Sequence, residues 1–475
     1  MKILFKCIYI IITLVLLTGC SADTYDSEQS ILSPAPSPVE QTPAGTAQFQ
    51  LPPFIMTQPP HDDWSQLCII NAAWLLSELD ALLERDNGAL WGVHLRGPFM
   101  IADSITREVV ANMPDERGNL EKQGDVYVGT LDRNALIGTT ASEINGQWWG
   151  MITWGFIEDH SDDLYYVLEI MAHELFHAWQ DELFEGEIRW HDNCHMDELD
   201  ARVSVRLELN ALMKALGTTG YERLDAINDA LSIRAERRRN HDGADGEIFN
   251  EINEGTAVYT HIRLTRDELP DIIDAMEYYL ETYIEGQSMR MFGYMSGALY
   301  GFLLDELGAT WKQGLHYESD LGALLKNAAG ISELKPFGDI DLDMYGFTDI
   351  TAFETEWVNN HVRLLDEAQE IFSETVLRFE SDGDFKSFTD NILVLFVTDF
   401  ETVFYGNFIF EGAFGQITVT EGFLLLGRTP FMFEVSARDI EIDGINIKGP
   451  GWTIELNEGF KIYELPDNHL EVRHG

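Results

Sequence analysis

The sequence predicts an α+β protein in which a mainly helical body precedes a separate all-β domain. Two observations support this class. From about residue 161 to residue 373, apolar residues recur at the three- and four-residue spacing of amphipathic helices. From residue 374 to residue 475, Val, Ile, Phe and Thr alternate in short runs broken by Gly and Asp, which predicts a β-sandwich or barrel-like domain.

Residues 1–20 are typical of a bacterial lipoprotein signal peptide. A basic start precedes an apolar stretch, and Leu17-Thr18-Gly19-Cys20 resembles the lipobox at which such chains are cleaved and acylated on cysteine. The apolar stretch is too short to cross a bilayer comfortably. We therefore expect an exported, cell-surface or envelope protein that contacts a membrane only through a lipid anchor at Cys20. An uncleaved anchor is the alternative, and it also places the body outside the cytoplasm.

Residues 21–50 are rich in Ser, Pro, Thr, Asp and Glu and contain too few apolar residues to fold. They predict a disordered tether between the membrane and the body. About 45% of the chain is hydrophobic, which suits two or three domains with cores of their own.

The net charge is strongly negative, with 81 acidic residues against 31 Lys and Arg, or −50 in total. Such a field argues against nucleic acid and anionic membrane surfaces as partners. It weakly favours cationic ligands, although a solvated acidic surface is the commoner reason for this bias.

Cysteine gives no framework for the fold. Apart from Cys20, only Cys68 and Cys194 remain beyond the signal peptide, and the sequence leaves open whether they pair. The stretch from His191 to His195 contains two His, an Asp and a Cys, but it has no partner cluster. We interpret it as a loop or helix entry rather than a second metal site.

Residues 51–160 predict a helix followed by a small sheet. The helix spans residues 63–85, and the strands span residues 97–103, 125–131 and 148–154.

Residues 161–373 predict a succession of helices. The first begins with an N-cap and an acidic first turn in Ser161-Asp162-Asp163 and continues without Gly or Pro up to Gly186. The others are predicted at residues 196–216, 221–238, 246–264, 269–283, 292–307 and 352–372.

The first of these helices carries His-Glu-Leu-Phe-His at residues 173–177, which matches the His-Glu-x-x-His pattern of zinc hydrolases. Positions four apart share one helix face, so His173 and His177 can bind one Zn²⁺. Glu174 can reach a water on that ion as general base. The alternative is a pair of histidines on an ordinary amphipathic helix.

Such a site needs a third protein ligand, and two later carboxylates are candidates. Residues 253–257 read Asn-Glu-Gly-Thr-Ala, and residues 294–298 read Tyr-Met-Ser-Gly-Ala. Together with the His-Glu-x-x-His motif, this stretch of about residues 160–308 resembles the gluzincins, metallopeptidases of the peptidase MA type. The resemblance implies a zincin-like fold, Glu254 as the third ligand and Tyr294 as the residue that supports the oxyanion.

The spacing departs from the best-known gluzincins. Seventy-six residues separate His177 from Glu254, where the membrane alanyl aminopeptidase family has eighteen, and an inserted helix pair at residues 196–238 would account for the difference. Glu198 is the rival ligand, at a spacing close to that of the thermolysin-like members. Glu251, one turn before Glu254, is a plausible partner for one of the histidines.

The aminopeptidase signature Gly-x-Met-Glu-Asn, which holds a free substrate amine, is absent. The nearest stretch, residues 150–154, reads Gly-Met-Ile-Thr-Trp and lacks the Glu. The strand at residues 148–154 is either an edge to which an extended peptide adds or a plain core strand.

The sequence therefore predicts a zinc-dependent metallopeptidase that cleaves peptide bonds of a peptide or protein substrate, exo or endo, at the cell surface, with Glu174 as base acting on zinc-bound water. The alternative is a non-catalytic surface lipoprotein with a zincin-like scaffold, in which the β-domain binds extracellular ligands. Either interpretation leaves the oligomeric state open.

Overall fold

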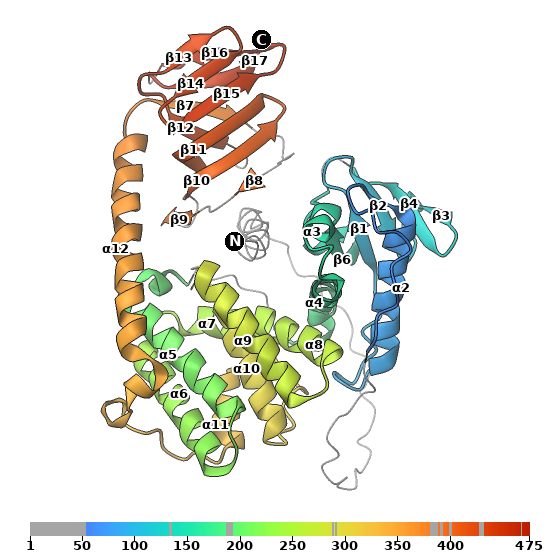
Figure 1. The fold of residues 1–475 in the computed structure, drawn as a ribbon, viewed down its shortest axis with the longest axis vertical. Helices are drawn as coiled ribbons and strands as arrows, with labels where there is room; N and C mark the ends of the chain where they lie inside the picture. Colours follow the sequence, from blue (N-terminus) through green and yellow to red (C-terminus); the bar gives the residue numbers. More distant parts are fainter. Residues whose placement is uncertain are drawn as a thin grey trace, which may run out of the picture.

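The computed structural model describes residues 54–475 except 133–134, 187–192, 287–288, 290–291, 381–387, 390–392, 399–400, 427–431 and 467. The predicted signal peptide, the tether and Cys20 lie outside this range. The predicted α+β class is confirmed, with a sheet and helices in the first part and strands at the C-terminal end (Figure 1). Within the described residues, no helix has the length and apolarity needed to cross a membrane.

A six-stranded mixed sheet forms the N-terminal layer. Its strands lie in the order β3-β4-β2-β1-β6-β5, and only the β1–β6 pair is parallel. The bounds are β1 Phe99–Ala102, β2 Glu108–Ala111, β3 Glu121–Gln123, β4 Val126–Thr130, β5 Thr140–Ile144 and β6 Gln147–Thr153. The three predicted strands correspond to β1, β4 and β6, whereas β2, β3 and β5 were not predicted.

One expectation about this region is corrected, and one pair of alternatives is decided. The first helix, α2, spans Ile69–Asp86 and not 63–85, because the Asp63 carboxylate accepts hydrogen bonds from both the backbone N–H and the hydroxyl of Ser65 and makes a turn there. Strand β6 pairs with β1 on one side and β5 on the other, so it is an interior strand and β5 is the edge.

The motif helix packs directly on this sheet. After β6 the chain forms α3 (Trp154–Asp159) and then α4 (Leu164–Leu183), whose first turn is capped by the Asp163 side chain. Gly150 on β6 allows the close approach, since a Cβ there would lie 2.9 Å from the Leu175 Cα. The helix that carries residues 173–177 therefore rests on the interior of the sheet.

The remaining helices form the second part of the body. They are α5 Leu199–Leu216, α6 Gly220–Asn240, α7 Ala244–Asn250, α8 Thr256–Thr265, α9 Leu269–Gly286, α10 Gly293–Glu306, α11 Leu321–Ala328 and α12 Phe347–Phe372. The helix predicted at residues 246–264 is divided, because a π-helical turn at Glu251–Gly255 joins α7 to α8. The predicted helix pair at 196–238 corresponds to α5 and α6, which pack together.

The long helix α12 leads from the helical body to the C-terminal strands, which lie at its far end (Figure 1). The strands are β7 Val376–Glu380, β8 Phe388–Thr389, β9 Leu393–Thr398, β10 Glu401–Gly412, β11 Gly415–Leu426, β12 Met432–Ser436, β13 Glu441–Asp443, β14 Asn446–Gly449, β15 Trp452–Leu456, β16 Phe460–Glu464 and β17 Leu470–His474. Strands β12 and β15 both pair with the long strand β11, so one connected sheet divides into two branches at β11. Side chains from both branches pack into one hydrophobic core.

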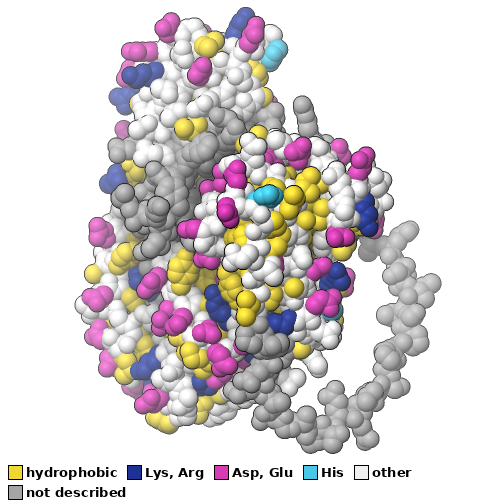
Figure 2. Space-filling model, turned by 45° about the vertical axis from the view of Figure 1, so that its right-hand side comes forward, with side chains coloured by type: hydrophobic (Ala, Val, Ile, Leu, Met, Phe, Trp, Pro, Cys, Tyr) yellow, Lys and Arg dark blue, Asp and Glu magenta, His cyan; other side chains and the backbone are white. Residues whose placement is uncertain are grey.

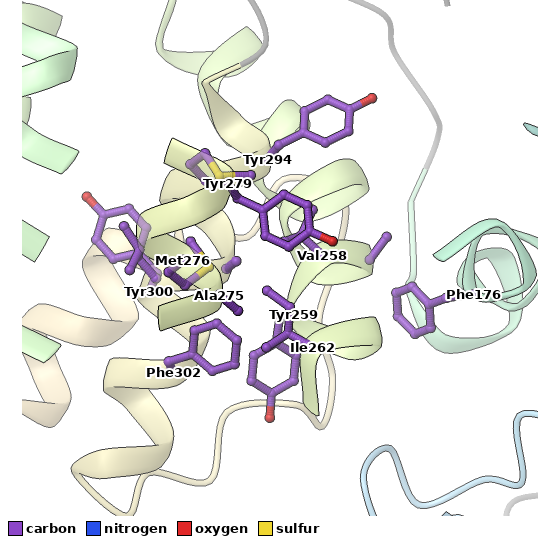
Figure 3. Close-up of a cluster of buried hydrophobic side chains, with 14 of the residues drawn as sticks. Phe176, Val258, Tyr259, Ile262, Ala275, Met276, Tyr279, Tyr294, Tyr300 and Phe302 are labelled. Atoms are coloured by element: carbon purple, nitrogen blue, oxygen red, sulfur yellow. The ribbon is translucent and has the colours of Figure 1, made fainter. Parts of the chain in front are cut away.

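Hydrophobic side chains from α4, α8, α9 and α10 form the core beside the motif helix. Figure 3 shows part of it, including Phe176 of α4, Tyr259 and Ile262 of α8, and Met276 of α9. On the outside, acidic side chains are spread over the visible face and outnumber the basic ones (Figure 2). The negative charge is thus a distributed property of the surface.

Candidate metal centre

The structure brings His173, His177 and Glu254 together. The Nε2 atoms of the two imidazoles are 3.0 Å apart, and Glu254 Oε2 lies 3.4 Å from the first and 3.2 Å from the second. The atoms belong to α4 and to the π-helical turn. His173 and Glu254 are buried, and His177 is partly buried. In the part of the chain that is described, these three form one of two groups of side chains that could hold a metal ion.

These separations fit a tetrahedral zinc site. Zinc binds nitrogen and oxygen ligands at about 2.0–2.1 Å, so two ligand atoms at a tetrahedral angle are about 3.3 Å apart. The three measured distances lie within about 0.3 Å of that value. Two imidazoles and one carboxylate, with a fourth position open, are also the donor set of catalytic zinc sites.

Each ligand is held by a partner of its own. His177 Nδ1 lies 2.7 Å from Gln180 Oε1, and His173 Nδ1 lies 3.3 Å from His261 Nδ1. The Asn253 amide donates to Glu254 Oε1 at 2.8 Å, which leaves Oε2 facing the imidazoles. Contacts of this kind fix the orientation of a metal ligand, so the two imidazole Nε2 atoms are presented to the same point.

The sequence interpretation missed Gln180 and His261. Gln180 lies three residues after His177 on the same helix face, which is a signal that could have been used. It also donates to the Asn253 carbonyl and at 3.3 Å to the Thr256 hydroxyl, so it ties α4 to the segment that carries Glu254. His261 follows Glu254 by seven residues, two turns along α8, and only the packing of α8 on α4 shows what it contacts.

The charges of the three side chains depend on one another. Burial lowers the pKa of His177, but the Glu254 carboxylate outweighs this effect and raises that pKa to about 9. Burial raises the pKa of Glu254, but His177 and His173 hold it well below the usual range. Glu254 is therefore ionised, and its Oε2 favours a positive charge beside it. That charge can be a protonated imidazole or a metal ion.

Glu174 is also buried, and burial raises the pKa of its carboxyl to about 8. The charge of Glu254 acts in the same direction, whereas that of His177 opposes it. A carboxyl group with a pKa near neutrality can both accept and return a proton, which is the property that a general base needs.

Tyr294 lies in the first turn of α10, and the structure places it beside the first imidazole. Its ring and that of His173 are nearly parallel, at an interplanar angle of 4°, with centroids 6.1 Å apart. The side chain is 2% exposed. This ring contact brings Tyr294 next to the first histidine of the cluster.

Glu251 does not contact either motif histidine. Its carboxylate accepts hydrogen bonds from both terminal nitrogens of Arg234 on α6 and from the Ser296 hydroxyl on α10, at 2.9 Å for the latter. The expectation that it orients a histidine is therefore wrong. It contacts α6 and α10 instead, because the three residues from Glu251 to Glu254 make less than one full π-helical turn, so the two carboxylates lie on different faces.

Glu198 lies outside the cluster. It is exposed, and it groups with Asp200 and His241, whose Nε2 is 3.0 Å from Asp200 Oδ2. His195 is buried against Glu247 at 3.0 Å, while His191 and Asp192 fall outside the described residues. Cys68 and Cys194 do not form a disulfide with each other.

We compared the chain with models of protein families, with curated proteins and with solved structures, and none of the three comparisons found a match.

Proposed function

We propose that this chain is a zinc-dependent metallopeptidase of the gluzincin type, acting on a peptide or protein substrate outside the cytoplasm. The observation that carries the proposal is the convergence of His173, His177 and Glu254 at distances that suit tetrahedral zinc, with Glu174 next to the first ligand. The export signal at residues 1–20 supports the location.

The chemistry follows from the groups present. His173, His177 and Glu254 would hold a Zn²⁺ ion, which would supply Lewis-acid chemistry for activating a water and polarising the scissile carbonyl. Glu174 takes the proton from the attacking water and passes it to the leaving amine. Tyr294 donates a hydrogen bond to the carbonyl oxygen as negative charge develops there.

The order of the motifs supports the gluzincin resemblance in particular. Glu254 lies in the Asn-Glu-Gly-Thr-Ala segment, and Tyr294 begins the Tyr-Met-Ser-Gly-Ala segment of α10. The two segments touch through their glycines, Gly255 and Gly297, because a Cβ on Gly255 would lie 2.5 Å from the Gly297 Cα. Glu254 and Tyr294 therefore lie on segments that adjoin at this contact, which supports the proposed roles of both residues.

Zinc analysis and a substitution of the base test the proposal together. The purified full chain is expected to hold about one zinc per molecule and to cleave a peptide library in a chelator-sensitive way. Glu174→Gln should abolish cleavage and keep the zinc, whereas His173→Ala should lose both. A chain that holds no zinc, or a Glu174→Gln variant that still cleaves, would overturn the assignment in favour of a non-catalytic scaffold.

A further inference from the structure

A second feature lies one helical turn from the candidate metal centre. It is a cavity of about 800 Å³ between the start of α4, the end of α8 and the first half of α9. Its size falls in the usual range of small-ligand sites, about 300–1,000 Å³. The deepest lining residue on α4 is Glu169, which is four residues before His173 and therefore about 6 Å away along the helix axis.

The walls combine aromatic rings with carboxylates. Tyr166 of α4 and Tyr279 of α9 have ring centroids 6.3 Å apart, and Tyr278 lies edge-on to Tyr279 at 5.9 Å. Six carboxylates line the cavity, against the single guanidinium of Arg266. Aromatic faces and carboxylates together favour an organic cation, because both attract positive charge and the rings also cover its carbon atoms.

The protein's own cations leave part of this negative charge uncompensated. Arg266 forms an ion pair with Glu169, and Arg85 binds Asp267 at 3.2 Å. Asp271 and Asp274, one turn apart on α9, make neither a hydrogen bond nor an ion pair with any described residue. These two carboxylates are therefore available to a ligand.

The geometry argues against a metal ion in this cavity. A calcium ion needs six to eight oxygen ligands within 2.3–2.6 Å, roughly, of one point. Among the described residues, no three carboxylates of the cavity lie close enough together to form a metal-binding group. Widely spaced carboxylates beside aromatic rings suit a long cationic side chain better.

The cavity shares a wall with the metal centre. The Tyr279 hydroxyl donates to Glu169 at 3.1 Å, and its ring lies 5.6 Å from that of His261, which contacts His173. In Figure 3 the Tyr279 hydroxyl points away from α9, toward the side on which Phe176 of α4 lies. The 6 Å step from His173 to Glu169 corresponds to about two residues of an extended peptide.

We propose that this cavity, with Asp271 and Asp274 on one wall and Tyr166 and Tyr278 on the others, binds a Lys or Arg side chain of the substrate. The assignment of the ligand to a substrate rests on the proposed peptidase function. The cavity thereby makes the enzyme selective for peptides that carry a basic residue about two positions from the cleaved bond.

Binding is tested without catalysis, in the full-length His173→Ala variant. Titration calorimetry with butylguanidinium is expected to show salt-sensitive binding, and the neutral isostere butylurea should bind at least about tenfold more weakly. Asp271→Asn together with Asp274→Asn should weaken butylguanidinium binding at least about tenfold. The matched control is Glu277→Gln with Glu281→Gln, two exposed residues of α9 outside the cavity, and it should change binding less than about twofold.

Selectivity is tested in the otherwise unaltered chain with a peptide library. Cleaved peptides should be enriched in Lys or Arg at one fixed position, and the Asp271→Asn, Asp274→Asn pair should remove that enrichment. The control pair Glu277→Gln, Glu281→Gln should leave both the enrichment and the overall cleavage unchanged. Equal effects of the two pairs of substitutions, or no preference for butylguanidinium over butylurea, would overturn the cavity proposal. Selective butylguanidinium binding by a chain that cleaves nothing would support the cation site and overturn the peptidase function instead.

Discussion

Gly255 and Gly297 lie against each other at the crossing of the π-helical turn and α10. A Cβ on Gly297 would come within 2.4 Å of the Glu251 carbonyl oxygen and 2.8 Å of the Gly255 Cα. Since these atoms belong to the backbone, they cannot move aside cheaply. The contact explains physically why both motif segments contain glycine where they do.

Gly297→Ala is therefore expected to separate the two segments. Overpacking of this kind costs about 1–3 kcal/mol of unfolding free energy. It should also weaken zinc binding, because Glu254 moves with the turn. Denaturant unfolding and zinc titration measure the two effects. Gly338→Ala is the control, since nothing lies within 4 Å of a Cβ at that position, and an equal loss in both variants would contradict the prediction.

Zinc binding should release at least the His177 proton near pH 7. Glu254 outweighs the effect of burial and raises the pKa of His177 to about 9, so the imidazole is protonated at pH 7 in the metal-free protein and must lose that proton to bind zinc. As the pH increases toward 9, the apparent zinc affinity should therefore rise about tenfold per pH unit. Calorimetry in two buffers of different ionisation enthalpy, between pH 6.5 and 7.5, counts the proton. An identical heat in both buffers would contradict this account.

Gln180→Ala should weaken zinc binding about 10- to 100-fold without unfolding the chain, because His177 loses the contact that fixes its ring. His261→Phe should act in the same direction through His173. Competition with a chelator of known affinity gives the ratio. The control is Gln369→Ala, at an exposed position of α12, which should leave the zinc affinity unchanged. An equal loss of affinity in both variants would contradict the role of Gln180.

Tyr294→Phe removes only the proposed oxyanion donor. We expect kcat to fall about 10²- to 10³-fold while KM and zinc content stay near those of the unaltered chain. Steady-state kinetics on a peptide cleaved by that chain provides the test. Tyr221→Phe, at a residue that is 81% exposed, is the control. A higher KM with an unchanged kcat would instead show that Tyr294 helps to bind the substrate in its ground state.

Glu247 ties α7 to α6 and to His195 through buried ion pairs. It pairs with Arg237 at 2.8 Å, Arg238 at 2.7 Å and His195 at 3.0 Å, all on one buried carboxylate. Glu247→Gln removes one charged partner from each arginine, while Arg237 keeps Glu208 and Arg238 keeps Asp320, so it should cost about 1.5–3 kcal/mol of unfolding free energy at pH 7.

The pH dependence of that difference has a definite sign. Burial raises the pKa of Glu247, but Arg237 and the other partners outweigh this and hold it well below the ordinary 4.5. The stabilisation is therefore fully present above about pH 4.5 and is lost as the pH falls toward the lower folded value. Denaturant unfolding at pH 7 and pH 3 measures the unfolding free energies of the unaltered chain and of Glu247→Gln. The difference between them should be smaller at pH 3 than at pH 7. An equal difference at both pH values would mean that the ionised Glu247 carboxylate does not cause the stabilisation.

The sequence by itself determined the features that depend on neighbouring residues. Helical periodicity located α4 and most of the helices that follow it, although it missed α11. The four-residue spacing of His173 and His177 fixed their common face before any packing was known. The change from helical to alternating patterns also separated the helical body from the C-terminal strands.

Only the tertiary structure decided what meets across long stretches of chain. It brought Glu254 and not Glu198 to the two imidazoles, turned Glu251 toward Arg234, supplied His261 to His173, and placed β6 inside the sheet. It also formed the cavity between α4 and α9. The physical reason is that helix geometry is set by local backbone bonds, whereas contacts between residues 77 positions apart, such as His177 and Glu254, depend on how whole helices pack.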